Sequence, residues 1–305
     1  MSNTPEPTPF FSRRSVRISL GISIGALLVM GLGSWYVLGA GSHPLTVSNA
    51  LDRFRSSEGK TPGTTVTSTS PSPSPSGSNA PHPGARSTTN PGLGATVPRS
   101  PSRRPPPDGV YVYATQGGEQ TDALSGQKHQ YPSQTTITLT HAGCGSVARW
   151  QPLSERWDET EACQTTRGVT LRRYSMYHQF FHKGVREDFA CGSDAVVMPW
   201  NQVAGDHWTF VCHSSGTTLD MAVRVVGFEM VDVGGRSIRA VHIRYDGRAS
   251  GNDSGTETQD RWLTPDEGLF LRIVSSADIQ TSTPFGRAHY LESYRIDLTS
   301  TSPER

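Results

Sequence analysis

The pattern of hydrophobic and polar positions divides the chain into three regions. Residues 18–40 form an uncharged, mostly apolar run, and residues 61–107 consist largely of Pro, Ser, Thr, Gly and Asn. From residue 109 onward, short runs rich in Val, Ile, Thr, Tyr and Phe are separated by Gly, Pro, Asn and Asp. The three patterns predict a membrane-spanning helix, a disordered linker and a β-rich domain, respectively.

The β-rich region predicts a curved antiparallel meander, either a half-barrel or a closed barrel, so the fold class is mostly all-β. Gly234-Gly235 suits a tight hairpin turn, and Pro265 presets the turn at 264–268. No segment of this region has a long apolar stripe with a period of 3.6 residues. The expected strands are 110–114, 134–141, 169–181, 207–213, 221–231, 236–245, 259–263, 269–274 and 288–298.

Two of these strands indicate what the sheet covers. In 288–298, the side chains of Tyr294 and Ile296 share one face while Ser293 and Arg295 lie opposite, which predicts a wet outer side. The strand 221–231 is apolar on both faces, so we expect both to be covered, as in a strongly curved sheet or a closed barrel. Its faces are Ala222, Val226, Phe228 and Met230 on one side, and Met221, Val223, Val225 and Val231 on the other.

The run at 18–40 predicts a single-pass anchor in the cell membrane. At 1.5 Å per residue it is long enough to cross a hydrocarbon core of about 30 Å. Arg13, Arg14 and Arg17 precede it and the next basic residue is Arg53, so the positive-inside rule keeps residues 1–17 in the cytoplasm. The C-terminal domain is then extracytoplasmic. A cleaved signal peptide is the alternative.

The rest of the chain divides at the changes in composition. Residues 41–108 are expected to be a juxtamembrane segment and linker, with a short helix at 45–55. Residues 109–299 form the β domain, and 300–305 a C-terminal tail. The linker cannot bury enough apolar surface to fold, and its prolines favour extended conformations.

Four widely spaced cysteines lie beyond the anchor, with no C-x-x-C pair for zinc or redox chemistry. An even number in an oxidising compartment predicts two disulfides. Three pairings are open, and free buried thiols are the alternative. We favour Cys144–Cys163 and Cys191–Cys212, because each closes a loop of about twenty residues, which by chain entropy stabilises the fold by roughly 3 kcal/mol.

The balance of charges and the absence of known motifs argue against several classes of function. The 28 basic and 27 acidic side chains are nearly balanced, which argues against nucleic acid as a partner. No G-x-S-x-G or phosphate-binding glycine motif occurs. His178 and His182 have helical metal-site spacing, but they fall in a predicted strand and lack the H-E-x-x-H glutamate. We therefore expect no enzyme, no metal and no cofactor.

One set of charged residues is a candidate for binding a polar head group or for a structural ion pair. Glu292 falls on the apolar face of the last strand, and Arg224, Arg244 and Arg272 belong to neighbouring predicted strands. A cross-strand ion pair is the simpler interpretation.

Two segments resemble known families. Residues 262–272 (WLTPDEGLFLR) resemble the strand–turn–strand hairpin of LolA/LppX-type lipoprotein-carrier half-barrels, and residues 109–115 (GVYVYAT) resemble the opening of actinobacterial membrane-anchored secreted β-domain proteins. The half-barrel family binds acyl chains in an apolar cavity, so the resemblance implies a carrier.

Together these features predict a non-catalytic extracytoplasmic module that binds or carries an apolar ligand or an envelope component. The alternative is a structural or interaction protein of the cell envelope that docks a protein partner. Its expected partners are the lipid bilayer, through one helix, and an apolar ligand or envelope protein.

Overall fold

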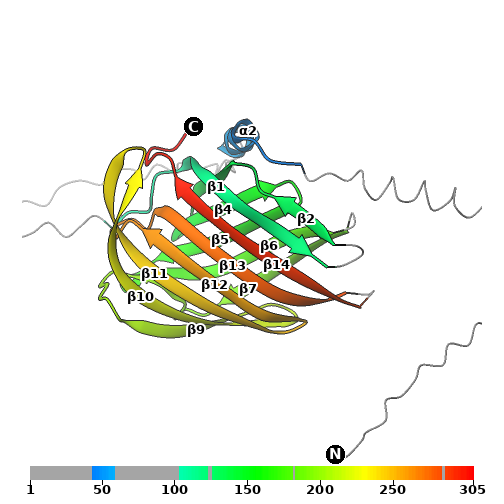
Figure 1. The fold of residues 1–305 in the computed structure, drawn as a ribbon. Coiled ribbons are helices and arrows are strands. Elements are labelled where there is room, and N and C mark those ends of the chain that lie inside the picture. Colours follow the sequence, from blue (N-terminus) through cyan, green and yellow to red (C-terminus); the bar gives the residue numbers. More distant parts are fainter. Residues whose placement is uncertain (1–42, 59–102, 123–125, 181–182, 284–285) are drawn as a thin grey trace, which may run out of the picture. The chain divides into compact units, whose positions relative to one another are not determined.

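The computed structural model describes residues 43–58, 103–122, 126–180, 183–283 and 286–305 (Figure 1). Within these ranges no helix is both long enough and apolar enough to span a bilayer. The run at 18–40 lies outside the described residues, so the anchor stays a prediction.

The described chain holds one helix, α2 (Val47–Glu58), and a series of antiparallel strands. The strands are β1 (Gly109–Thr121), β2 (Gln127–Gln130), β3 (Gln134–Ala142), β4 (Gly145–Leu153), β5 (Arg156–Gln164), β6 (Gly168–Phe180), β7 (Lys183–Cys191), β8 (Val196–Pro199), β9 (His207–His213), β10 (Thr217–Val233), β11 (Arg236–Gly251), β12 (Asp253–Leu263), β13 (Phe270–Thr283) and β14 (Gly286–Leu298).

Twelve of the described strands close into an antiparallel barrel (Figure 1). Neighbours in the barrel mostly follow one another along the chain, and the ring closes where β1 pairs with β14 from Tyr113↔Leu298 to Thr121↔Tyr290. Two short strands are not among these twelve: β2 pairs with β1, and β8 pairs with β6. The mostly-β antiparallel meander is confirmed, in its closed form.

Every strand expected from the sequence is present, most of them longer than predicted. Both predicted turns are also found: Gly234, Gly235 and Gly268 have φ of 58°, 79° and 79°, in the left-handed region that glycine tolerates. The sequence analysis missed β4, β5 and β7, whose patterns are interrupted by charged residues, and the four-residue strands β2 and β8.

The expectation that both faces of 221–231 are covered is wrong. Val223 and Val225 face the barrel interior and are 2% and 0% exposed. The register shifts at a bulge between Val225 and Gly227, but beyond it Val231 and Val233, which have the same alternation as Val223 and Val225, again pack in the core. Val226, Phe228 and Met230 stay exposed. One face of this strand is therefore buried, and the other carries an exposed apolar row.

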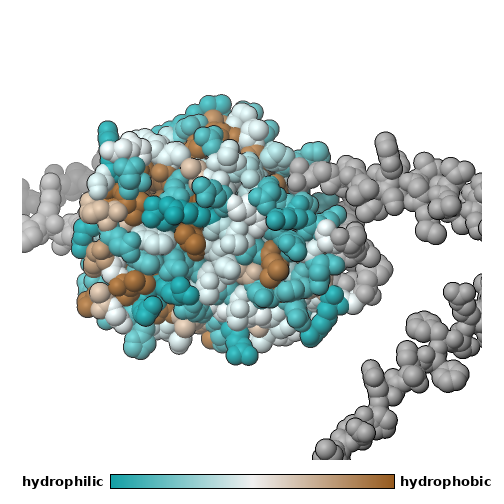
Figure 2. All heavy atoms as spheres, in the orientation of Figure 1, coloured by the Kyte–Doolittle hydropathy of each residue, from teal (hydrophilic) through white to brown (hydrophobic). Residues whose placement is uncertain are grey.

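The interior is filled by two clusters of buried side chains. One is centred on large aromatic residues of β1, β4 and β14, including Tyr111, Trp150 and Tyr294. The other lies around β9 to β11 and includes Phe210, Val225 and Ile243. The outer side meets water: the face seen in Figure 2 is mostly hydrophilic or intermediate, with apolar residues scattered over it.

The folded unit begins at residue 43, ahead of the predicted linker. Thr46 and Asn49 cap α2 reciprocally, each side chain accepting a hydrogen bond from the other's backbone N–H at 3.3 Å. Phe54 is 2% exposed, and α2 contacts β1 and β3. Arg53 donates to Gln151 Oε1 at 2.6 Å. The helix expected at 45–55 is thus part of the same compact unit as the barrel.

Two further segments pack against the start of β1. Val110 and Glu304 exchange backbone hydrogen bonds of 2.9 Å, so the C-terminal tail pairs with the barrel. Ahead of β1, the Arg103 guanidinium lies 5.4 Å from the centre of the Trp200 ring. The Tyr111 hydroxyl donates to the Pro107 carbonyl at 2.8 Å. Helix α2, which ends at Glu58, and the residues from 103 onward therefore both belong to the folded unit.

The described cysteines form the two disulfides that were predicted, Cys144–Cys163 and Cys191–Cys212. Cys191 lies directly opposite Cys212, in one of only two residue pairs that join β7 to β9 in the described barrel. This bridge closes the place where the barrel has the least backbone pairing.

Candidate functional site

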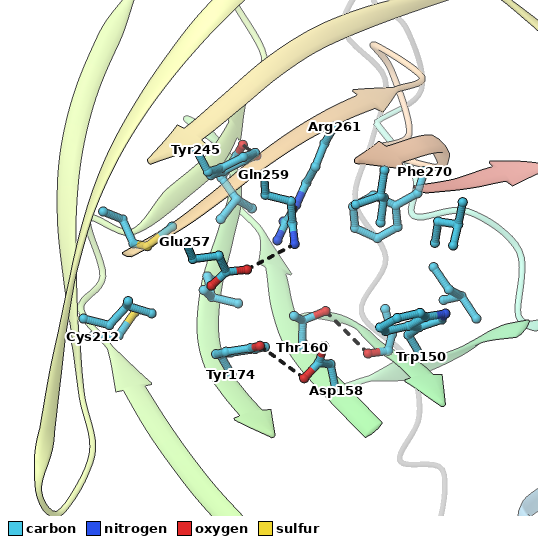
Figure 3. A pocket seen from close by; sticks show the side chains of 18 of the residues that line it. Trp150, Asp158, Thr160, Tyr174, Cys212, Tyr245, Glu257, Gln259, Arg261 and Phe270 are labelled. Atoms are coloured by element: carbon cyan, nitrogen blue, oxygen red, sulfur yellow. Dashed lines mark hydrogen bonds between the residues drawn. The ribbon is translucent and has the colours of Figure 1, made fainter. Parts of the chain in front are cut away.

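A cavity of about 90 Å³ lies inside the barrel (Figure 3). One part of its wall is apolar, with Trp150, Phe210, Leu219, Met221, Phe270 and Ile273. The other part is polar, with Asp158, Tyr174, Glu257, Gln259 and Arg261. A dry engineered cavity of roughly 150 Å³ accommodates benzene, so this cavity has room for a few heavy atoms and not for an acyl chain.

Three polar residues of the wall come from alternate positions of β12. Because side chains of a strand alternate between its faces, Glu257, Gln259 and Arg261 all point inward. Gln259 lies between the charged groups: it donates to Glu257 Oε1 at 3.4 Å and accepts a hydrogen bond from Arg261 Nε. On the facing wall, Tyr174 donates to Asp158 Oδ1 at 3.2 Å (Figure 3).

The Glu257 carboxyl is the least compensated charge of this wall. In the described part of the chain it makes no salt bridge, and the bond from Gln259 is long. Burial and, after it, the charges of Asp158 and Glu292 raise the pKa of Glu257 to about 7, against the opposing charges of Arg261 and Arg156. Near neutral pH this carboxyl is therefore poised to take up a proton or another cation.

Arg261 is held against aromatic rings. Its guanidinium carbon lies 4.5 Å from the centre of the Tyr245 ring and 5.6 Å from that of Phe270. Tyr245 in turn donates to the Val197 carbonyl. The guanidinium is thus part of the wall, with its position fixed by stacking.

A buried ionic network adjoins the cavity. Arg156 of β5 binds Asp158 through two nitrogens at 2.6 and 2.7 Å and lies 3.2 Å from Glu292 of β14. Tyr131 donates to Glu292, and Tyr290 donates to Glu119 at 2.9 Å. These contacts satisfy buried charges that would otherwise be costly.

Glu119 is the second carboxylate of this network. Burial favours its neutral form, but hydrogen bonds from His129 and His178 and the charge of Arg156 outweigh burial and hold the pKa of Glu119 well below its usual range. The same bond raises the pKa of His129, whose Nδ1 lies 2.9 Å from Glu119 Oε1. Glu119 is accordingly ionised, with a cationic partner.

A further acidic pair lies on the inner face. Ser214 donates to Glu187 Oε1 at 2.5 Å, and Thr217 donates to Asp253 Oδ2 at 3.2 Å. Burial and, after it, a hydrogen bond shared with Asp253 raise the pKa of Glu187 to about 7. Asp253 is four residues from Glu257 on β12, so both face the interior.

The structure separates the residues that the sequence analysis grouped as a candidate ion-pair set. Glu292 is inside, as expected, but its partner is Arg156. Arg244 binds Asp260 at 3.1 Å and Arg272 binds Asp297 at 2.5 Å, both on the outer face. Arg224 is exposed on the outer face of β10. The grouping failed because the arginines lie in opposite phase to the buried residues of their strands.

The histidine candidates also take separate places. His178 lies on β6 with its ring centre 4.9 Å from that of Tyr290, while His182 lies outside the described residues. Within the described chain no group of His, Cys, Asp and Glu has the arrangement of a metal site.

Sequence reasoning missed Arg156, Asp158 and Glu257. For Glu257 the signal was present, because it is in phase with Leu263, a core residue of the same strand. Polar residues in phase with a buried leucine mark an inward-facing polar row.

Comparison with known proteins identifies no relative that could name a function. No family model matches the chain, and no curated protein matches it. A crystal structure of the hypothetical lipoprotein YmcC from Escherichia coli (K12) is similar at 11% identity, with a TM-score of 0.30, over 62% of this chain and 86% of that one. A TM-score this low carries no conclusion. The resemblance to LolA/LppX-type carriers is thus supported only as far as a mostly-β barrel, and the actinobacterial resemblance stays a prediction.

Proposed function

We propose that this protein is a non-catalytic binding module whose barrel takes up a small ligand in its central cavity. The observation that carries the proposal is a cavity of about 90 Å³ whose wall combines aromatic rings with the weakly partnered Glu257. Binding sites are typically mostly apolar with a few placed polar groups. We further propose that the barrel is displayed outside the cytoplasm on the anchor at 18–40, where its disulfides would persist.

The size of the cavity changes the expected ligand. The sequence predicted an apolar ligand or envelope component, and the resemblance implied an acyl chain. Two packed apolar clusters and the ionic network around Arg156 occupy much of the interior, so we propose a compact ligand in place of a long chain.

Filling the cavity tests the proposal. Ala148 is on the cavity wall, and Ala148→Leu would occupy the space without changing any charge. Ala222→Leu on the outer face of β10 is a matched control. Small-molecule binding to the purified full chain, followed by NMR chemical shifts, should disappear in the first variant and remain in the second. Saturable binding of a fluorescent fatty acid to the wild-type chain, blocked by Ala148→Leu, would contradict a small-ligand site.

A specific observation favours a second candidate, the docking of a protein partner. Val226, Phe228 and Met230 are 39%, 38% and 62% exposed along one stretch of β10. A photo-crosslinking side chain at Met230 should give a discrete protein adduct in intact cells if this row is an interface. The same probe at Val185, which is 52% exposed on β7, is the control. Equal or absent labelling at the two positions would reject docking through this row.

A further inference from the structure

We infer that the ligand of the central cavity is a small organic cation of the alkylammonium class. This inference rests on the proposed small-ligand function and adds the charge and size of the ligand. Its basis is the excess of carboxyl groups in the interior, together with the aromatic side chains around Glu257, a carboxyl group that makes no salt bridge within the described chain.

The inner face of the described barrel is acidic. It carries two guanidinium groups, Arg156 and Arg261, and two imidazoles, His129 and His178. Opposite them stand six inward-facing carboxyl side chains: Glu119, Asp158, Glu187, Asp253, Glu257 and Glu292.

The ion pairs within the described interior neutralise some of these carboxyl groups and leave others, including Glu257, without a cation. Arg156 forms ion pairs with Asp158 and Glu292, and His129 contacts Glu119. Arg261 donates to Gln259 and stacks on rings, and it makes no salt bridge within the described chain. A cation next to Glu257 would supply the charge that is missing there.

The remaining wall suits the apolar part of such a cation. Trp150, Tyr174, Phe210 and Tyr294 surround the cavity with aromatic surface. Ammonium and methylated ammonium groups bind favourably against aromatic faces, and more strongly where water is excluded. An anion would find Arg261 but would also meet Glu257 and Asp158, which repel it.

The volume limits the size of the ligand. Because about 150 Å³ holds the six carbons of benzene, a cavity of about 90 Å³ admits on the order of four heavy atoms. Methylammonium and trimethylammonium fall in this range.

The affinity for the cation should depend on pH, because binding pairs the cation with the ionised carboxylate of Glu257. The ionisable groups around Glu257 are Asp158 and Arg156 on β5, Tyr174 on β6, Arg261 on β12, and Glu292 and Tyr294 on β14. A cation binds best to the ionised carboxylate, so its affinity should rise as the pH increases from 6 to 8.

The test uses the purified full chain and calorimetric titration with three probes. Trimethylammonium is the cation, tert-butanol is a neutral molecule of similar size, and acetate is an anion. We expect trimethylammonium to bind at least about ten-fold more tightly than either of the others at pH 8. Glu257→Gln should remove about ten-fold of this affinity or more, while Glu304→Gln, an exposed position near the C-terminus, should leave it unchanged.

The outcomes separate the two proposals. If tert-butanol binds as tightly as trimethylammonium and Ala148→Leu blocks it, the cavity is a ligand site but the cation class is wrong. Preference for acetate, or full affinity in Glu257→Gln, would also overturn the cation class. If no small probe binds in a manner sensitive to Ala148→Leu, both proposals fall.

Discussion

Arg156 and Glu292 meet across the inside of the barrel, with Nη2 and Oε1 3.2 Å apart, although their strands β5 and β14 are not neighbours in the sheet. The side chains are 3% and 6% exposed. This contact joins two opposing parts of the wall that backbone hydrogen bonds do not connect directly.

Removing the cation from this pair should be strongly destabilising. Arg156→Met leaves Asp158 and Glu292 buried without their partner, and we expect a loss of roughly 3–5 kcal/mol in urea unfolding. Arg295→Met breaks the exposed pair with Asp297 and should cost about 1 kcal/mol or less. Similar losses of unfolding free energy in the two variants would show that the buried pair stabilises the fold no more than the exposed one.

The stability of the barrel should depend on the protonation of Glu257. Its pKa is raised above the ordinary value to about 7, so the protonated form is favoured by folding. The stability that this gives is complete below the unfolded-state pKa and is lost as the pH rises through about 7. Glu257→Gln should therefore show a smaller fall in Tm between pH 5 and pH 8 than the wild-type chain.

The effect of Glu257 must be taken from the difference in Tm between wild type and Glu257→Gln at each pH. Glu187 also has a pKa of about 7, and it titrates in both proteins. Parallel Tm profiles for wild type and Glu257→Gln would contradict the assigned environment of Glu257.

Helix α2 should be a structural part of the barrel unit. Phe54→Ala removes its one fully buried side chain and is expected to cost about 3 kcal/mol. Hydrogen exchange should accelerate across 47–58 in this variant. Ser56→Ala, on the exposed side of the helix, is the control. Unchanged exchange in Phe54→Ala would mean that polar contacts such as Arg53 with Gln151 are sufficient to hold the helix.

The two disulfides should differ in their local effect while contributing similar free energies. Their sequence separations are 19 and 21 residues, so chain entropy predicts roughly 3 kcal/mol for each. Only Cys191–Cys212 reinforces a junction with two backbone residue pairs. Replacing both of these cysteines by serine should open β7 and β9 to hydrogen exchange, whereas replacing Cys144 and Cys163 should leave β7 protected. Equal protection of β7 in the two double variants would contradict this assignment.

The sequence was sufficient for the strands whose inner and outer faces differ clearly. In β14 the buried Tyr294, Ile296 and Leu298 alternate with exposed residues, and the predicted range matches the observed one closely. In β5, Arg156 and Asp158 stand at inner positions while Glu159 lies outside, so no hydrophobic alternation marks the strand.

The interior charges could not be paired from the sequence. Arg156 and Glu292 are 136 positions apart, and their contact depends on the closure of the barrel and on the register of several strands between them. The exposure of one face of β10 could not be predicted either, because both faces of this strand are apolar and the pattern alone does not indicate which of them meets water.

Glu58, the last residue of α2, and Arg103, beside Trp200, both belong to the folded unit. Residues 59–102 therefore separate, along the sequence, two parts of one unit, and the first of these parts begins at residue 43, ahead of this segment. Lengthening it would cost only about 0.6 kcal/mol of closure entropy for each doubling. A fluorescent reporter or affinity tag placed there would leave unchanged the number of residues between the predicted anchor and the first docked residue. This segment is therefore a suitable site for labelling the protein without changing its tether.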